Sequence, residues 1–125
     1  DMRNGINGIF QFQIYGIPMT GDDICGFNRE SWDEICARWM SVGAFFPFAR
    51  NHNCVNMPPQ EPFAFGLDSK TLSSSKLALN MRYSLLRYYY TELFKVSLGE
   101  KGSFFKPLFF KISSTLNESY SPYES

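Results

Sequence analysis

Between residues 17 and 53, two short apolar segments flank one amphipathic segment, and a cluster of polar residues directly follows each apolar segment. The apolar segments are 17–21, which precedes Asp22 and Asp23, and 44–48, which precedes the sequence RNHN at 50–53. Between them, the SWDE sequence at 31–34 has the form of a helix capping box, and apolar residues then recur at helical spacing through Met40. A wholly apolar second segment is typical of a strand that is buried on both faces of a parallel sheet. The pattern therefore predicts strand, helix, strand.

The two polar clusters are expected at one edge of that sheet. In a parallel α/β barrel all strands end at the same rim, and the loops that leave those ends carry the functional groups. Asp22 and Asp23 would then lie beside Arg50 and His52. A turn carboxylate for Asp22 and a loop-bracing ion pair for Arg50 are equally good interpretations of the spacing alone. A lone histidine is more often structural than a ligand.

The remainder of the chain predicts three further elements. Apolar positions from 2 to 15 follow helical spacing, although glycines weaken that helix. The apolar stretch 76–98 is too long for a strand and predicts a mostly buried helix that ends at Gly99. Residues 104–112 are typical of a strand, which Pro107 would confine to an edge or a bulge. The polar tail that follows could begin another subdomain.

Composition limits the classes of partner. The chain has 125 residues, is 44% hydrophobic, and carries 12 Lys and Arg against 12 Asp and Glu. Without an excess of basic residues, nucleic acid and anionic membrane surfaces are disfavoured. No apolar run approaches the ~20 residues of a membrane span, and no signal peptide opens the chain, so any export signal is expected outside it. The many aromatic residues, with Phe doublets at 45–46, 104–105 and 109–110, favour burial inside something larger.

Several kinds of chemistry find no support in the residue pattern. One histidine and no paired cysteine spacing do not build a zinc site, so no metal is expected. No Gly-x-Ser-x-Gly elbow and no glycine-rich phosphate loop occur, and no cofactor is expected. The remaining role for Asp, Arg, His and aromatic residues at a rim is to hold a polyhydroxylated ligand by hydrogen bonds and ring stacking.

Four stretches of the sequence carry a resemblance that sharpens this interpretation. YGIPMTGDDICGF, ESWDEICARWMSVGAFFPFARNHN, PPQEPFAF and LNMRYSLLRYYYTELF resemble glycoside hydrolase family 31, in its branch of lysosomal and brush-border α-glucosidases. The resemblance covers residues 7 to 110 approximately. It implies a retaining α-glucosidase on a (β/α)8 TIM barrel, an α/β fold. Residues 1–100 would be the C-terminal part of the barrel, with strands 7 and 8, and residues 101–125 would begin a β-rich C-terminal domain.

The resemblance also implies roles for individual residues. Asp23 corresponds to the family's carboxylate in the glucose subsite, and Phe27 to the aromatic wall of that subsite. His52 corresponds to the imidazole that bonds a hydroxyl of the non-reducing glucose, and Arg50 to the guanidinium that braces Asp23. None of these residues is catalytic. The nucleophile and the acid/base of the family lie in upstream Trp-x-Asp-Met-Asn-Glu and Trp-x-Gly-Asp-Asn motifs, and neither motif occurs here.

The cysteines and one glycosylation sequon give information about the cellular compartment in which the protein works. Cys25 and Cys36 correspond to a pair that is disulfide-bonded in this branch of the family, which would leave Cys54 unpaired. Three reduced, buried thiols are the alternative. Asn117 begins an Asn-Glu-Ser glycosylation sequon, consistent with export. The resemblance implies the secretory pathway, with the lysosome, secretion and the cell surface all open.

Two residues depart from the family pattern. Asp22 stands where members usually have Ala, and Arg87 stands where a Pro usually interrupts the long helix, so the helix is expected to be straighter.

Two functions of different class follow from these observations. The first is a segment of an active α-glucosidase that cleaves terminal glucose from α-linked oligosaccharides, with the rest of the barrel as its structural partner. The second is a degenerate, non-catalytic carbohydrate-binding paralogue or subunit. An unrelated structural domain is a third possibility.

Overall fold

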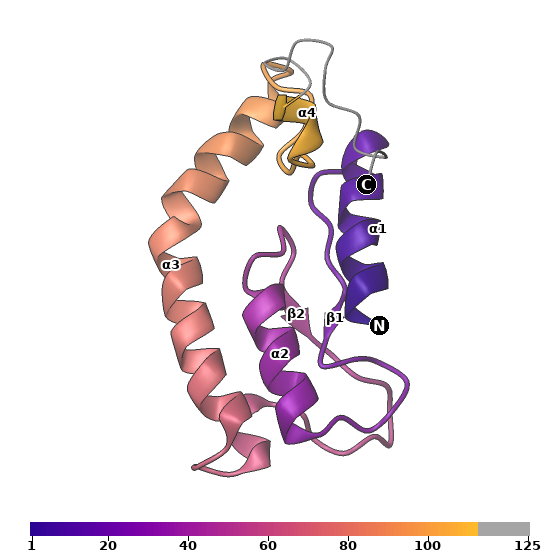
Figure 1. The fold of residues 1–125 in the computed structure, drawn as a ribbon, viewed down its shortest axis with the longest axis vertical. Helices are drawn as coiled ribbons and strands as arrows, with labels where there is room; N and C mark the ends of the chain where they lie inside the picture. The colour runs from indigo at the N-terminus through magenta and orange to yellow at the C-terminus, as the bar shows by residue number, and fades with distance from the viewer. Residues whose placement is uncertain (113–125) are drawn as a thin grey trace, which may run out of the picture.

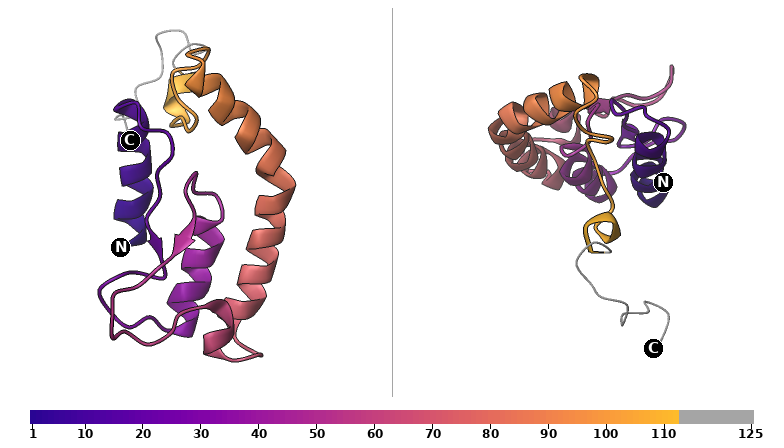
Figure 2. Two further views of the ribbon diagram at one scale, coloured as in Figure 1. Left: turned by 180° about the vertical axis from the view of Figure 1, so that it is seen from behind. Right: turned by 90° about the horizontal axis from the view of Figure 1, so that it is seen from above.

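The computed structural model describes residues 1–112, which form four α-helices, one short 3-10 helix and a pair of short strands (Figure 1). The elements in chain order are α1 (Met2–Ile14), β1 (Asp23–Ile24), α2 (Asp33–Gly43), β2 (Arg50–Asn51), the 3-10 helix η1 (Pro62–Phe65), α3 (Lys70–Ser97) and α4 (Phe109–Ile112). The long helix α3 runs along one side of the molecule and α1 along the other, with α2 packed against α3 (Figures 1 and 2).

The strands lie a few residues later than the sequence predicts. β1 and β2 pair in parallel, with Asp23 opposite Arg50 and Ile24 opposite Asn51, whereas 17–21 and 44–48 contain no strand. The prediction for 44–48 was wrong because the backbone after α2 continues to turn: the Phe45 N–H donates to the Val42 carbonyl and the next N–H to the Gly43 carbonyl, at 3.0 Å each. Strand pairing therefore begins only inside the polar clusters.

The two apolar segments nevertheless meet beside the strands. The Phe48 N–H donates to the Thr20 carbonyl at 3.0 Å, just before the β1–β2 pair. A Cβ on Gly21 would collide with the Phe48 carbonyl oxygen, so this approach of two backbones requires glycine. Parallel pairing of the two segments, with α2 as the crossover, is thus the arrangement that the sequence predicts.

Helix α2 begins differently from the predicted capping box. Its first residue is Asp33, its N-cap is Trp32 without a side-chain cap, and the Ser31 hydroxyl is buried without a hydrogen-bond partner. Asp33 instead receives hydrogen bonds from the Lys70 and Thr71 N–H groups of α3, at 3.1 and 2.8 Å. These bonds, first that from Thr71, hold the pKa of the Asp33 carboxyl below its usual range. One carboxylate thus ties the beginnings of the two helices together.

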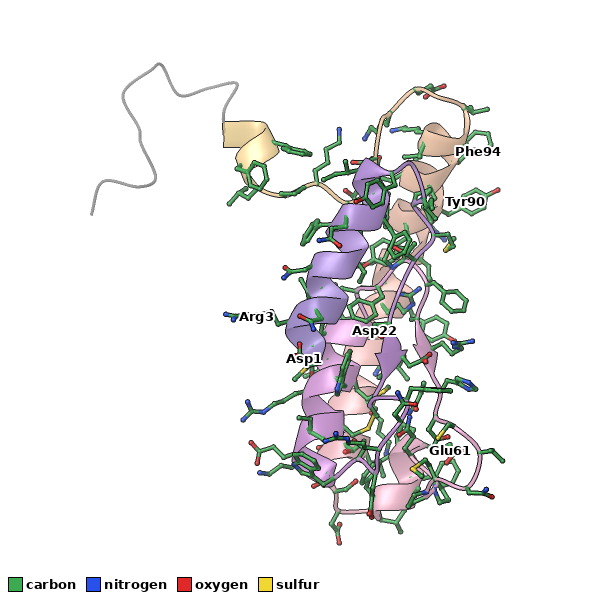
Figure 3. All side chains as sticks on the ribbon, turned by 90° about the vertical axis from the view of Figure 1, so that its right-hand side faces the viewer. Asp1, Arg3, Asp22, Glu61, Tyr90 and Phe94 are labelled. Atoms are coloured by element: carbon green, nitrogen blue, oxygen red, sulfur yellow. A yellow bond between two sulfur atoms is a disulfide. The ribbon has the colours of Figure 1, made fainter. Side chains whose placement is uncertain are left out.

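Helix α3 begins at Lys70, earlier than predicted, because Ser69 caps it by accepting a hydrogen bond from the Leu72 N–H at 3.1 Å. It continues without a break through Arg87. The prediction that this helix is mostly buried was wrong for the described chain: Leu77, Tyr83 and Tyr90 are 69%, 71% and 74% exposed. Described residues cover the face of α3 toward α2 and η1 and, farther along the helix, Tyr89 and Glu92, which contact the turn after α2 and the segment at 101–105. Figure 3 shows Tyr90 and Phe94 projecting from the helix.

A small core lies where α1, β1 and α2 meet. Its buried members come from all three elements and from the turns after β1 and α2: Ile9, Ile24, Cys25, Cys36, Trp39, Met40 and Phe46. The guanidinium of Arg82 on α3 supports that turn by donating to the carbonyls of Ala44, Phe46 and Pro47, at 2.7, 2.6 and 3.1 Å. The core therefore fixes the base of the β1–β2 pair.

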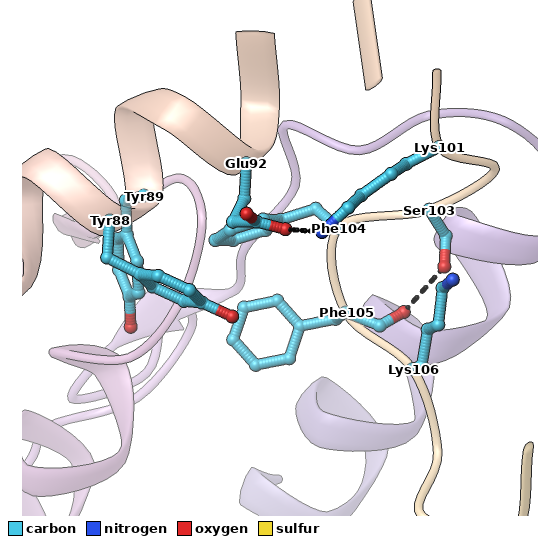
Figure 4. Close-up of a pocket in the computed structure, with 8 residues that line it drawn as sticks. All are labelled: Tyr88, Tyr89, Glu92, Lys101, Ser103, Phe104, Phe105 and Lys106. Atoms are coloured by element: carbon cyan, nitrogen blue, oxygen red, sulfur yellow. Dashed lines mark hydrogen bonds and ion pairs between the residues drawn. The ribbon is translucent and has the colours of Figure 1, made fainter. Parts of the chain in front are cut away.

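The predicted strand at 104–112 is absent, since residues 101–108 are irregular and α4 follows. Side chains hold this segment in place. The Gln13 amide oxygen accepts from the Phe104 and Phe105 N–H groups at 3.1 and 3.2 Å, and Glu92 is paired with Lys101. Around that pair lies a pocket of about 270 Å³ (Figure 4). The sequon at Asn117 lies outside the described residues.

Candidate functional site

The turn that follows β1 carries the aromatic residue of the predicted site. Cys25 and Gly26 both have left-handed backbones, with φ of 72° and 92°, and the Gly26 N–H donates back to the Asp23 carbonyl at 3.0 Å. A left-handed conformation is rare for a residue with a side chain, so the position of Cys25 is held from outside the turn. The turn ends the strand at once and brings Phe27 to the edge of the pair, where its ring is partly exposed.

A disulfide supplies that external hold. Cys25 and Cys36 are bonded, with their Cα atoms 4.5 Å apart, and this joins the turn after β1 to the first turns of α2. Cys36 is fully buried, and Cys54 is a free, half-buried cysteine. The disulfide, which Figure 3 draws in yellow, matches the pairing that the resemblance implies. It fixes one end of the segment that contains Phe27.

Asp23 and Arg50 form an ion pair across the two strands. The Arg50 Nε and Nη2 atoms both donate to Oδ1 of Asp23, at 3.1 and 2.8 Å. The guanidinium also lies 5.6 Å from the centre of the Phe48 ring. Because both donors reach the same oxygen, Oδ2 of Asp23 is left to accept a hydrogen bond from a ligand. The Asp23 side chain is 21% exposed and that of Arg50 is 51% exposed, so water and ligand can both reach the pair.

Phe27 and His52 make a second contact across the strands. Their ring centres are 5.3 Å apart and the ring planes are inclined by 31°. The Cys54 N–H donates to the Phe27 carbonyl at 3.0 Å, so the loop after β2 is also joined to this turn by its backbone. The four residues predicted from the sequence thus form two contacting pairs at one edge of the β1–β2 pair.

A cleft of about 400 Å³ opens beside these residues. Asp23 and Phe27 line it, together with Asp22 and Trp32, whereas Arg50 and His52 contact the lining residues from the neighbouring strand. Asp22 accepts a hydrogen bond from the Asp23 N–H at 2.9 Å. The cleft offers carboxylates and aromatic faces, the groups that bind sugar hydroxyls and sugar rings.

Gln60 is a site-region residue to which sequence reasoning gave no role. It is 5% exposed and lies in the loop between β2 and η1, and its amide nitrogen donates to the carbonyls of Ile24 and Gly26. It also exchanges hydrogen bonds with Asn51. Gln60 falls within the PPQEPFAF stretch, and the two polar residues between Pro59 and Pro62 are the signal that could have identified it.

Within residues 1–112, no three acidic, histidine or cysteine side chains gather where they could hold a metal ion. In the same part of the chain, no helix has the length and apolar character that crossing a membrane requires. The residues that line the cleft offer hydrogen bonding by a paired carboxylate and stacking on an aromatic ring.

The chain matches the family model described as glycosyl hydrolases family 31 TIM-barrel domain over residues 1–92. That range contains α1, both strands, α2 and most of α3. The match confirms that these residues are a fragment of a TIM barrel, and it includes all four residues of the predicted site.

Curated relatives include the lysosomal acid alpha-glucosidase of Tetrahymena pyriformis, 50% identical over 87% of this chain and 12% of that protein. Human probable maltase-glucoamylase 2 is 50% identical over 73% of this chain and 4% of that protein. Among solved structures, a glucosidase II alpha subunit superposes with a TM-score of 0.75 at 31% identity over 86% of this chain and 11% of its own. The family 31 alpha-glucosidase of Bacteroides thetaiotaomicron superposes with a TM-score of 0.69 at 36% identity, over 74% of this chain and 16% of its own. The chain thus spans about an eighth of the first relative's length.

Proposed function

The chain belongs to glycosyl hydrolase family 31, and we propose that residues 1–100 are the part of its (β/α)8 barrel that contains strands 7 and 8 and binds the terminal glucose of an α-linked oligosaccharide. β1 and β2 are these two strands, and α2 is the crossover helix between them. The polypeptide that contains them is a retaining α-glucosidase. Curated relatives named as α-glucosidases support this assignment.

The observation that carries the proposal is the arrangement of the Asp23–Arg50 and Phe27–His52 pairs at one edge of the parallel strands. Asp23 accepts a hydrogen bond from a glucose hydroxyl through Oδ2 while Arg50 occupies Oδ1. Phe27 packs against the sugar ring, and His52, held beside Phe27, bonds a hydroxyl of the same glucose. Charge-assisted and aromatic contacts of this kind orient a polyhydroxylated ring in one position.

Glucose binding at this edge serves a reaction whose bond-breaking groups come from elsewhere in the barrel. Retaining hydrolysis requires a nucleophilic carboxylate and an acid/base carboxylate about 5–5.5 Å apart. The motifs that carry those two carboxylates in the family do not occur in this sequence, and the Arg50 ion pair holds Asp23 as an oriented hydrogen-bond acceptor. The chain's own contribution is to hold the sugar so that its anomeric carbon faces that carboxylate pair. Positioning of this kind lowers the barrier without chemical participation.

The other parts of the proposal concern the chain's surroundings. The exposed apolar face of α3 packs against neighbouring elements of the same barrel, which is the structural partner of this segment. Residues 101–125 begin a C-terminal β-domain, and Asn117 carries a glycan. The protein works in the secretory pathway, in the lysosome, outside the cell or at its surface. The Cys25–Cys36 disulfide supports such an oxidising compartment.

The test of the proposed function is hydrolysis of a chromogenic α-glucoside by the complete polypeptide that contains this chain. His52→Ala is expected to lower kcat/KM by about 10- to 100-fold, the effect of losing one or two hydrogen bonds to the sugar. Val55→Ala is the matched control, since Val55 lies in the same loop and is 84% exposed. Unchanged activity of the histidine variant contradicts the assignment of its imidazole to glucose. A wild-type protein that binds the sugar and does not cleave it supports the non-catalytic alternative instead.

A further inference from the structure

Gln60 connects three segments of the chain from which the candidate site is built, two through their backbone and one through a side chain. Its Nε2 atom lies 3.2 Å from the Ile24 carbonyl oxygen in β1, 3.1 Å from that of Gly26 in the following turn, and 2.9 Å from Oδ1 of Asn51 in β2. In return, Nδ2 of Asn51 donates to the Gln60 carbonyl at 2.8 Å. A single buried amide therefore contacts both strands and the turn between the strand and Phe27.

The residues that Gln60 holds are immediate neighbours of the aromatic pair. Gly26 precedes Phe27 in the chain, and Asn51 precedes His52. The Gln60 amide is therefore bonded to the backbone next to Phe27 and to the side chain of the residue next to His52, so it links the two positions from which the rings project. Gly26 has no side chain of its own to fix the left-handed turn, and the disulfide holds the turn only at Cys25.

A buried glutamine can also serve stability alone, and the chain contains a matched example. Gln13 is 3% exposed, donates to the Pro18 carbonyl at 2.9 Å and accepts from two N–H groups of the segment at 104–105. Its burial and its number of partners are close to those of Gln60. None of its bonds, however, reaches β1, β2 or the loops that carry the candidate site.

We propose that Gln60 is a positioning residue for glucose binding: its amide sets the distance and angle between Phe27 and His52, and through them the fit of the sugar ring. This inference rests on the proposed function. It assigns to Gln60 no contact with the sugar, since the side chain is buried and its amide nitrogen is bonded within the protein. Its loss therefore changes how well the site is formed, while the sugar-contacting groups remain present.

The experiment compares Gln60→Met with Gln13→Met in the complete polypeptide. Methionine keeps the length of the side chain and removes its hydrogen bonds, so both variants leave buried polar groups unpaired and are expected to lose similar thermal stability. For the chromogenic α-glucoside, KM is expected to rise about 10-fold in the Gln60 variant. This is the size of effect expected when one hydrogen bond to the sugar is weakened because the site is less well formed. The Gln13 variant is expected to keep KM within about 2-fold, because its lost bonds do not reach the strands.

A second readout does not depend on catalysis. Cys54 is half-buried, and its N–H is bonded to the Phe27 carbonyl, so the rate at which a thiol reagent labels it reports on opening of this loop. Labelling is followed by mass spectrometry of the Cys54 peptide in the folded protein. We expect about 10-fold faster labelling in Gln60→Met than in wild type. Loss of the Gln60 hydrogen bonds makes opening of the loop more frequent, and the labelling rate rises in proportion. Gln13→Met is expected to label at the wild-type rate.

The outcomes separate this inference from the function on which it rests. An active wild type in which the two glutamine variants have equal KM values overturns the positioning role and leaves the α-glucosidase assignment intact. Unchanged Cys54 labelling in Gln60→Met overturns it as well. A wild type that neither hydrolyses nor binds the α-glucoside, and whose Cys54 labelling still depends on Gln60, overturns the proposed function and with it any role for Gln60 in glucose binding.

Discussion

The Asp23–Arg50 pair makes the most direct prediction about substrate binding. Replacing Arg50 with Met removes both donors to Oδ1 of Asp23 and keeps much of the aliphatic length. The carboxylate is then free to rotate, and Oδ2 no longer has a single position from which to accept a sugar hydroxyl. The variant therefore tests whether the guanidinium acts on glucose through Asp23.

The structure limits how much of the effect can come from stability. The Arg50 side chain is half exposed, and an ion pair of this exposure contributes about 1 kcal/mol or less to folding. The guanidinium over the Phe48 ring adds about 0.5 kcal/mol. Within the binding site, by contrast, losing the orientation of a charged acceptor costs about 1.4 kcal/mol, or tenfold in kcat/KM. The activity loss should thus exceed what the small destabilisation explains.

A double-mutant cycle on the chromogenic α-glucoside measures this dependence. Arg50→Met alone is expected to lower kcat/KM about tenfold and Asp23→Asn about a hundredfold, because the carboxylate contacts the sugar directly. In the Asp23→Asn background, Arg50→Met should then change kcat/KM by less than about twofold. Arg38→Met is the control: its partner Glu34 forms an exposed pair on α2, away from the site. Additive effects of the two site substitutions would refute the idea that Arg50 acts through Asp23.

Two further predictions concern the framework. Replacing Cys25 and Cys36 together with Ser should remove about 3 kcal/mol, as expected for a bridge between residues 11 apart, and shorten the half-life of activity on heating; a half-life equal to that of wild type would contradict this. The second concerns Glu92, whose pKa is lowered from the ordinary 4.5, first by the hydrogen bond from Lys101. The contribution of ionised Glu92 to folding stability is therefore fully present above pH 4.5 and is lost as the pH falls through the lower pKa of the folded protein. An acid protease should then cut the 101–106 segment faster at pH 3 than at pH 5. Glu92→Gln should abolish most of that pH difference, and an unchanged difference would show that another group is responsible.

The first helix and the strand–helix–strand unit after it were predictable because local signals were strong. Apolar residues recur at helical spacing from Trp32 to Met40, and α2 lies where that pattern indicates, between two parallel strands. Helix α1, predicted over 2–15, is confirmed as Met2–Ile14. The polar clusters at Asp23 and Arg50 are adjacent, as the rule for parallel strands requires. Periodicity and strand direction were sufficient for these features.

The positions of boundaries were not predictable, because long-range partners decide them. Ser31 has the sequence of an N-cap, and yet the hydroxyl is buried and α2 begins two residues later. Asp33, which lies within the same predicted capping box, accepts a hydrogen bond from the beginning of α3 instead. The segment at 104–108 has strand composition without a described strand to pair with, and side chains of Gln13 and Glu92 hold it as a loop. Sequence spacing carries no signal for such contacts.

The roles of the site residues were predictable to different degrees. The pairing of Asp23 with Arg50 came from the resemblance, and the structure contains it. The contact of Phe27 with His52 joins two residues that had been assigned separate roles. The connecting role of Gln60 depends on three carbonyl-type acceptors that come together only after the chain has folded. Networks of this kind are visible in coordinates alone.

The two hydrogen bonds that Gln13 accepts from Phe104 and Phe105 have a consequence for biosynthesis. They connect the first helix to residues made some 91 positions later. During vectorial synthesis, the Gln13 amide oxygen stays with water until residue 105 has emerged, although its nitrogen can already bond Pro18 and Ile9 can already pack against α2. Chain growth therefore allows α1, α2 and the cystine to assemble first, and the segment at 104–105 to be joined to them last.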